Sequence, residues 1–413
     1  MKISRFLLPV LLAGVAAANV THDGEVSSED GTIYNIPAGG YQLVENENFY
    51  NCYSEGFGGA IYVGEGATVE LKGSLEFAGN FGEAYEEYGE WFGLASSDVY
   101  LSKDATLILN AAAAGDVITL GSGVEGYDSE RTAKIVKTGA GTANLGGAGD
   151  VNDFMCFEGI LDVQQGKLSV RTDLNAVSTT VSKEASLEVH GDFHLALLNE
   201  KNRTALSVGP KNANNDPDAT GSIKGTEITL TSLKGGTLED INFSVTGVDE
   251  YTVDDIVLIN SNVHLKDEVA TYELSNLIVS ADSGIVSSAT ATLSGENYLV
   301  LGSASSDQLK GVTLADGVVL TLGCTPDILP SGEMGDTIVF NVILNGLQIA
   351  ENANVTLAAG GVTTHSAELS ITSWQVSEGG VSVSMSAKYV PEPATATLSL
   401  LALCGLAARR RRK

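Results

Sequence analysis

The sequence predicts an all-β solenoid, in which short strands coil repeatedly around one apolar core. Short segments along the 413-residue chain alternate apolar residues with Thr, Ser or Glu, as strands with one buried face do. Most of these segments follow a Gly, Asn or Asp turn signal, and the chain has 47 Gly but only 8 Pro. Between about residues 20 and 390, no segment of about twelve residues or more has the periodicity of an amphipathic helix.

Charge and composition exclude several classes of protein. Lys and Arg number 23 against 52 Asp and Glu, which gives a net charge of −29. A chain this acidic repels the phosphates of DNA and RNA, so a nucleic-acid partner is excluded. With 43% hydrophobic and 18% charged residues, the chain is too apolar to be disordered, and its glycines lack the three-residue period of collagen.

The N-terminus has the order of a secretory signal peptide. Two basic residues, Lys2 and Arg5, precede the apolar run 6–15, and small residues follow as far as Ala18. The apolar run is too short to cross a bilayer. We therefore expect segment 1–18 to form a signal helix that signal peptidase removes between Ala18 and Asn19, which makes the protein an exported one.

The C-terminus combines two prolines, an apolar run and a basic cluster. The uncharged, Ala- and Leu-rich run 394–408 favours a helix and would span about 22 Å, short of a bilayer core of about 30 Å. As a marginal membrane span it would leave the basic cluster cytoplasmic and the rest of the chain outside. The residues that define this tail are Pro391, Glu392 and Pro393, followed after the run by Arg409, Arg410, Arg411 and Arg412.

This tail resembles the PEP-CTERM sorting signal of bacterial envelope proteins, over about 24 residues. The resemblance implies that residues 391–413 form an apolar sorting helix. It also implies recognition by an exosortase-type transpeptidase, which cuts near the Pro-Glu-Pro triplet and passes the protein to the cell surface. We therefore expect a location in the bacterial envelope or on the outer surface, with transient anchoring by the tail.

Between the two ends, the spacing of similar segments indicates a coil. Thr68-Val69, Thr106-Leu107 and Thr142-Ala143 stand 38 and 36 residues apart, which predicts pairs of turns of about 18 to 19 residues each. The period fades after about residue 200. We therefore expect a solenoid over 19–200, and over 201–390 either its continuation or a second β domain of the sandwich type.

Two segments resemble known surface repeats. Gly58-Gly59-Ala60-Ile61 followed by Phe77-Ala78-Gly79-Asn80 resembles the paired motifs of polymorphic outer-membrane proteins, and 137–145 with 157–170 resembles an autotransporter-associated repeat. In the latter, Ala143 stands where the family repeat usually has Leu. The resemblance implies a right-handed parallel β-helix like an autotransporter passenger, many of which are adhesins. No membrane-barrel strands follow, so self-transport is not implied.

One segment is a weak metal-site candidate. If 187–195 were one strand, Glu188, His190, Asp192 and His194 would share a face, with successive side chains about 6.6 Å apart. A row of His190, Asp192 and His194 offers two or three ligands to zinc or copper, but no fourth ligand is identified. Outward polar residues on a solenoid face explain the row equally well, so we expect no metal and no cofactor.

Two further segments concern ligands. Segment 81–92 holds four carboxylates and five aromatic rings, and its Tyr85, Tyr88 and Trp91 are candidate sugar or partner contacts, unless the rings simply pack on the coil. Segment 211–221 is rich in oxygen ligands but lacks the spacing of a calcium loop, so a surface turn is the preferred interpretation.

The cysteines form no disulfide framework. Cys404 lies in the tail, and the exported part carries Cys52, Cys156 and Cys324, too far apart in sequence for a zinc motif. One disulfide with a free thiol and three buried thiols both remain open.

No catalytic motif is present, so the sequence favours a non-enzymatic protein. The expected function is that of a surface-displayed solenoid with a structural or adhesive role, whose ligand is a glycan or surface protein held along a side face. The alternatives are a polysaccharide-active β-helix enzyme (a lyase or glycoside hydrolase) and an inert component of an extracellular matrix.

Overall fold

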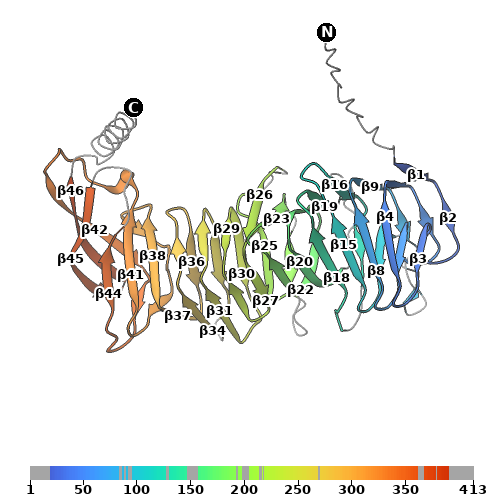
Figure 1. Cartoon of the computed structure of the whole chain (residues 1–413). Coiled ribbons are helices and arrows are strands. Elements are labelled where there is room, and N and C mark those ends of the chain that lie inside the picture. The colour runs from blue at the N-terminus through green and yellow to red at the C-terminus, as the bar shows by residue number, and fades with distance from the viewer. Residues whose placement is uncertain are drawn as a thin grey trace, which may run out of the picture.

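The computed structural model describes residues 19–82, 86–87, 90–91, 95–126, 130–146, 157–191, 194–197, 204–213, 216, 218–267, 270–360, 367–377 and 379–389. These residues form an elongated coil of short strands whose sheets run along its whole length (Figure 1). The only helix among them is the single 3-10 turn Pro326–Ile328. Thus no helix in the described ranges is long and apolar enough to span a membrane. The predicted signal helix (1–18) and sorting helix (391–413) lie outside those ranges.

Most turns of the coil contribute one strand to each of three faces. The first face, called the long sheet, is one sheet of 14 strands. Its strands, in order along the coil, are β1 (Val20–Asp23), β5 (Glu47–Tyr50), β9 (Leu75–Ala78), β16 (Val117–Leu120), β19 (Thr142–Leu145), β21 (Gly166–Val170), β23 (Ala185–His190), β26 (Thr220–Lys224), β29 (Thr237–Glu239), β32 (Val257–Ile259), β35 (Ile278–Val279), β38 (Glu296–Leu301), β41 (Val319–Cys324) and β44 (Thr356–Ala359).

The chain next crosses what we call the side face. In the first turns this face holds two short ladders, β2 (Val26–Ser27), β6 (Tyr53–Ser54), β10 (Phe81–Gly82) and β13 (Ala95–Ser96), then β3 (Tyr34–Ile36), β7 (Ile61–Val63), β14 (Val99–Leu101) and β17 (Val124–Glu125). Later it holds β24 (Leu195–Leu197), β25 (Leu206–Pro210), β30 (Ile241–Val245), β33 (Asn262–Leu265) and β36 (Gly284–Ser287). A small hairpin, β11 (Glu86–Glu87) with β12 (Glu90–Trp91), projects between β10 and β13.

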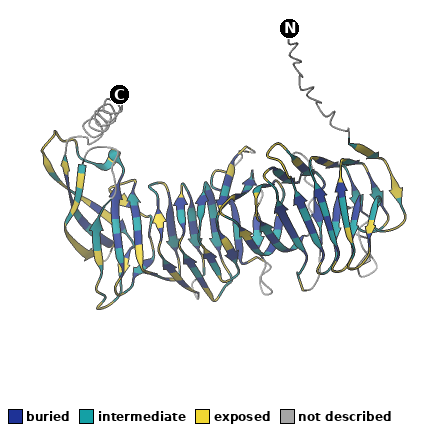
Figure 2. Ribbon diagram, viewed as in Figure 1, coloured by how far each residue is buried: buried dark blue, intermediate teal, exposed yellow. Residues whose placement is uncertain are grey.

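The third face returns the chain to the long sheet. Its strands are β4 (Tyr41–Glu45), β8 (Thr68–Lys72), β15 (Thr106–Asn110), β18 (Lys134–Thr138), β20 (Glu158–Val163), β22 (Leu174–Val181), β27 (Glu227–Thr229), β28 (Ser232–Lys234), β31 (Glu250–Asp254), β34 (Thr271–Ser275), β37 (Thr290–Ser294), β40 (Val312–Leu314) and β43 (Gln348–Ile349). Alternate residues of these strands point inward and are buried, so one apolar core runs through the coil (Figure 2).

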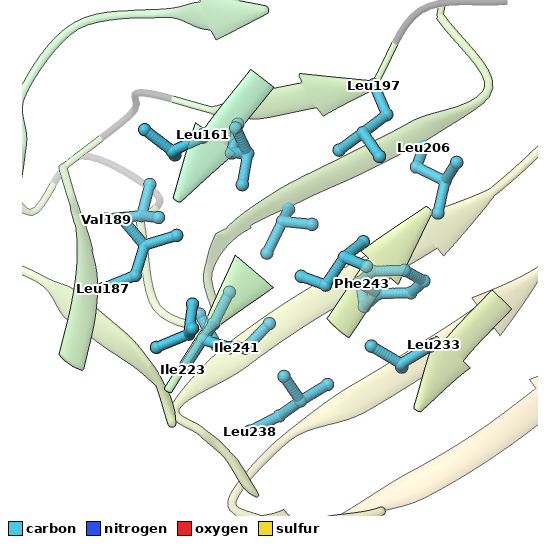
Figure 3. Close-up of a cluster of buried hydrophobic side chains, with 14 of the residues drawn as sticks. Leu161, Leu187, Val189, Leu197, Leu206, Ile223, Leu233, Leu238, Ile241 and Phe243 are labelled. Carbon is cyan, nitrogen blue, oxygen red and sulfur yellow. The ribbon is translucent and has the colours of Figure 1, made fainter. Parts of the chain in front are cut away.

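One turn of the coil runs in the opposite sense to all the others, and we call it the reversed turn. It consists of β25, β26 and β27, and each of these strands is antiparallel to both of its neighbours. Because the chain reverses twice, the strands before and after this turn point the same way. The core continues through it, since Leu187, Ile223 and Leu238 are successive buried neighbours in register (Figure 3).

Turn length differs on the two sides of the reversed turn. After it, Thr237 pairs with Val257 and Val257 with Ile278, so a turn takes about 20 residues. Before it, Tyr41 pairs with Thr68 and Thr68 with Thr106, so these intervals are longer and the second is nearly twice that of a later turn. The predicted turn length was therefore wrong here, because the interval from Thr68 to Thr106 is one turn with an insertion rather than two turns.

The coil continues far beyond residue 200, and its parallel pairing lasts until β44. A four-stranded sheet then closes its C-terminal end, with the order β39 (Ser305–Ser306), β42 (Thr337–Asn345), β46 (Gly380–Tyr389) and β45 (Ala367–Ser377). In this terminal sheet β46 is antiparallel to both of its neighbours. The second half is thus a solenoid, and the alternative of a β-sandwich is not what the structure shows.

Residues with a left-handed backbone make the tight corners of the later turns. Gly235, Asp255, Asn276 and Gly295 follow the third-face strands of four successive turns, and all have a φ between 55° and 70°. Gly, Asn and Asp adopt this conformation at the lowest cost. Their regular recurrence allows each of these turns to stay short.

Candidate functional site

The predicted metal row divides at a corner. Strand β23 ends at His190, and Gly191 turns the chain with a φ of 57°. His190 lies 2.9 Å from the Ser169 hydroxyl and 3.3 Å from Glu188, and burial lowers its pKa, with a smaller effect from the charge of Arg171. His194 lies past the corner, where its backbone N–H donates to Asp173, while Asp192 lies outside the described residues. No group of three metal-ligating side chains occurs in the described ranges.

Several predicted functional residues fall outside what the structure describes. These are Ala18, Cys156, Tyr85, Tyr88 and the whole sorting tail. Trp91 belongs to β12, and its side chain is not described. Cys52 and Cys324 are free and buried, and burial is the main cause that raises the pKa of each thiol to about 11.

A surface groove lies beside the reversed turn, on the outside of the side face. It has a volume of about 430 Å³. Its floor comes from outward residues of β25 and β30, and its ends come from the segments that follow β25 and β33. The lining residues are His194, Thr204, Leu206, Ser207, Gly209, Pro210, Lys211, Ala213, Asn242, Ser244, Thr246 and Lys266.

The groove is positively charged in an otherwise acidic molecule. Lys211 and Lys266 line it together with His194, which lies 3.8 Å from the Asp173 carboxylate, and none of the described lining residues is an Asp or Glu. The Lys211 ammonium donates to the Asn260 side chain at 2.8 Å and to the Asp282 carbonyl oxygen, which uses two of its three protons. Lys266 is exposed, and it takes part in none of the ion pairs found between described residues.

Neutral hydrogen-bonding groups cover the floor of the groove and continue beyond it. Ser207 pairs with Ser244 across the strands, and Asn242 pairs with Asn262 of the next turn, where the two side-chain amides lie 3.4 Å apart. His264 follows on the same outer row, opposite Ser244. Burial and the nearby Lys266 lower the pKa of His264, which favours the neutral ring. The outer row can therefore both donate and accept hydrogen bonds.

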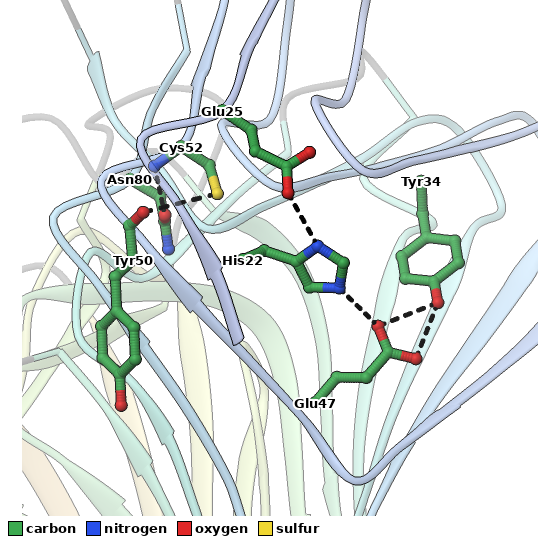
Figure 4. A network of polar contacts seen from close by, with 7 residues as sticks. All are labelled: His22, Glu25, Tyr34, Glu47, Tyr50, Cys52 and Asn80. Carbon is green, nitrogen blue, oxygen red and sulfur yellow. Dashed lines mark hydrogen bonds and ion pairs between the residues drawn. The ribbon is translucent and has the colours of Figure 1, made fainter. Parts of the chain in front are cut away.

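A second polar cluster closes the N-terminal end of the coil (Figure 4). The His22 ring nitrogens lie 3.0 Å from Glu25 and 3.1 Å from Glu47, and Tyr34 donates to Glu47 at 2.8 Å. His22 also stacks on the buried ring of Phe49 at 5.1 Å between centroids. Sequence analysis missed this cluster because its members come from two turns. Its geometry is that of a cap over the aromatic core.

Two buried charged groups sit in the early turns. The Asp98 carboxylate accepts hydrogen bonds from the Asn80 side chain at 2.7 Å and from the backbone N–H groups of Ser122 and Gly123. Burial raises the pKa of Asp98 to about 7 despite these bonds. Lys137 is fully buried and donates to three backbone carbonyl groups, and burial lowers its pKa to about 8. Neither group is accessible to a ligand.

Lys137 and the glycines after it shape one tight corner. A Cβ at Gly139 would overlap the carbonyl oxygen of Ala111, and one at Gly141 would overlap that of Asp116. At the same corner Lys137 donates to the carbonyl groups of Thr138, Gly139 and Gln165. The glycine-rich segment 137–142, which resembles a surface repeat, thus has a structural role that its contacts explain.

Comparison with known proteins identified no relative. No family model, no curated protein and no solved structure matches the chain.

Proposed function

We propose that the protein is an exported, surface-displayed β-solenoid with an adhesive or structural role, sorted and anchored through residues 391–413. Signal peptidase and an exosortase-type transpeptidase would process its two ends. We also propose that the coil is right-handed, as the resemblance to autotransporter passengers implies.

The groove on the side face is the observation that carries the adhesive role. It is open, it lies on the outside of a long coil, and its described lining residues carry cationic and neutral hydrogen-bonding groups but no carboxylate. Glycoside hydrolysis uses two carboxyl groups about 5 to 9 Å apart, and no described residue of the groove lining carries one. A binding surface therefore fits these residues better than a hydrolytic site.

The processing of the two ends fits the described coil. Asn19 is the first described residue, and its side-chain amide donates to Asn48 and to the Ser74 carbonyl group, both at 2.9 Å. Strand β1 begins at the next residue. Cleavage between Ala18 and Asn19 would leave the first turn complete. At the other end, β46 ends at Tyr389, so a cut near Pro391 would leave the terminal sheet complete.

The test is to measure the mass and location of the protein in the cells that produce it. We expect the full chain to lose both segment 1–18 and its tail and to be accessible to a protease added outside the cell. A chain truncated after Tyr389 should be exported but released into the medium. An unprocessed protein that stays in the inner membrane, or one found in the cytoplasm, would contradict the proposal.

A further inference from the structure

We propose that the groove beside the reversed turn binds an acidic polysaccharide, whose carboxylate groups meet Lys211 at one end of the groove and Lys266 at the other. This proposal rests on the proposed adhesive function and names the ligand class of the same site. It follows from the charge of the groove, from the chemistry of its floor and from the charge of the whole chain.

The charge of the groove requires an anionic group on the ligand. Two ammonium groups reach the groove, and no described residue of its lining is an Asp or Glu that could neutralise them. Asp267 follows Lys266 in sequence but is not among the lining residues. The bonds from Lys211 to Asn260 and Asp282 fix the position of its ammonium and leave one proton to donate. A carboxylate accepts such hydrogen bonds on both of its oxygens.

The floor of the groove suits a sugar ring. Ser207, Asn242 and Ser244 present hydroxyl and amide groups, and Gly209 adds no side chain to the floor. Hydroxyl and amide groups donate and accept equally, as the hydroxyl groups of a saccharide do. The outer row continues to Asn262 and His264 on the next turn, about 4.8 Å further along the coil. A chain of several sugar units can follow this row.

The net charge of −29 limits the charge density of the ligand. A polymer with two or more anionic groups per repeating unit, such as duplex nucleic acid or a heavily sulfated glycan, is repelled most strongly by the rest of the surface. A polymer with one carboxylate per sugar unit has a lower charge density, and its carboxylates can meet the lysines at the two ends of the groove. A carboxylated polysaccharide thus satisfies both the groove and the surface around it.

The experiment is to titrate the full chain with an oligogalacturonate of about ten units and, in parallel, with its methyl ester. The ester has the same sugar but no charge. We expect the acid to bind at least 10-fold more tightly than the ester and to weaken as salt is added. Dextran sulfate serves as the dense polyanion and should bind more weakly than the oligogalacturonate.

The matched variants are Lys266→Gln and Lys224→Gln. Both lysines are exposed and both changes remove one positive charge, but Lys224 ends β26 on the long sheet, outside the groove. We expect Lys266→Gln to weaken binding of the acid about 3- to 10-fold and to leave binding of the ester unchanged. Lys224→Gln should change neither.

Three outcomes would overturn the proposal: equal binding of acid and ester, equal effects of the two variants, or no binding of the acid. If dextran sulfate bound more tightly than the oligogalacturonate, the proposed carboxylated ligand would be wrong and a sulfated glycan would replace it. None of these outcomes bears on export or sorting. A correctly displayed protein that binds no acidic saccharide would refute only the proposed ligand of the groove. A protein found in the wrong location would refute the proposed surface display.

Discussion

The turns before and after the reversed turn enclose the same apolar core, but they differ in length and in the polar groups that they bury. The later turns are short, with about 20 residues each, and have left-handed Gly, Asn or Asp residues at one corner. Most earlier turns need more residues, and they enclose buried charged groups such as Asp98 and Lys137. Backbone groups are the main partners of both charges: Asp98 accepts from the N–H groups of Ser122 and Gly123, and Lys137 donates to three carbonyl groups. In this solenoid the described buried charges thus lie in the region of longer turns, where backbone groups surround them.

The two regions nevertheless share one device at the corner after the long sheet. Before the reversed turn, the backbone N–H of Cys52 donates to the Asn80 side chain of the next turn at 2.9 Å. After it, the backbone N–H of Ile241 donates to the Ser261 hydroxyl at the same distance. In both places a polar side chain of one turn satisfies a buried N–H of the preceding turn, which a bend would otherwise leave without a partner. The two regions therefore share the same corner geometry after the long sheet.

The largest expected effect separates the two kinds of corner. Gly139 and Gly295 have nearly the same φ, 73° and 70°. A Cβ at Gly139 would overlap a backbone carbonyl group, whereas one at Gly295 would meet only the end of the Asn276 side chain. We expect Gly139→Asn to lower the free energy of unfolding by about 3 kcal/mol or more and Gly295→Asn by less than about 1 kcal/mol. Urea unfolding of both variants measures this difference, and equal losses would refute the distinction between the corners.

Strand positions were predictable from the sequence, but the direction of the chain was not. The alternation of segments such as 105–109 and 186–189 matches the buried and outward residues of β15 and β23. Strand β26 alternates in the same way although it runs in the opposite sense. The alternation of apolar and polar residues shows which side chains are buried, but it is the same whichever way the strand runs. The turn length was misjudged because an insertion lies between Thr68 and Thr106, two residues that pair directly.

The groove was also beyond sequence reasoning. Lys211 was noticed only as the start of a polar turn, and Lys266 belongs to no motif. Ser207, Asn242 and Lys266 come from three successive passes of the chain over the side face. Only the strand register brings them together, and that register depends on the reversed turn. The polar row at Glu188 and His190 was correctly placed on an outward face, but its continuation to Asp192 and His194 required the strand to run past His190, where β23 ends.

The second prediction concerns the pH dependence of the two regions. Burial raises the pKa of Glu125, as of Asp98, to about 7. After the reversed turn, hydrogen bonds, above all the one from Ser275, lower the pKa of Asp254. A raised pKa means that the folded state holds the proton more tightly than the unfolded state. Stability therefore falls as the pH rises from about 4 to about 7, and the loss is complete above that range. The lowered pKa of Asp254 has the opposite sign, so its contribution is lost only as the pH falls through the acid range.

We expect the wild-type chain to be less stable at pH 8 than at pH 5, by about 2 kcal/mol for the buried carboxyl group of Asp98 and by less for that of the half-buried Glu125. Glu125→Gln should remove its share of this difference, because glutamine keeps the shape and cannot ionise. Asp254→Asn is the matched control and should leave the difference between pH 5 and pH 8 unchanged. Thermal midpoints at the two pH values provide the measurement. A Glu125→Gln variant with the full wild-type difference would show that this carboxyl group is solvated.

The smallest expected effect concerns the tyrosines. Removal of a tyrosine hydroxyl group is expected to destabilise the region before the reversed turn and to stabilise the region after it. Before the reversed turn, Tyr34, Tyr41 and Tyr50 each donate their hydroxyl group to a glutamate carboxylate. After it, Tyr251 and Tyr272 are buried neighbours in register, and their hydroxyl groups have no hydrogen-bond partner among the described residues. A buried hydroxyl group without a partner costs free energy, so its removal should be favourable.

We therefore expect Tyr251→Phe to raise the free energy of unfolding by about 1 kcal/mol and Tyr34→Phe to lower it by about the same amount. Both variants lose one oxygen atom and keep the ring, so a difference in sign reports the hydrogen bond alone. The urea midpoint at constant slope measures both changes. A Tyr251→Phe variant less stable than the wild type would mean that this hydroxyl group has a partner in solution. In that case the later turns enclose polar groups as the earlier ones do, and turn length would no longer explain the contrast between the two regions.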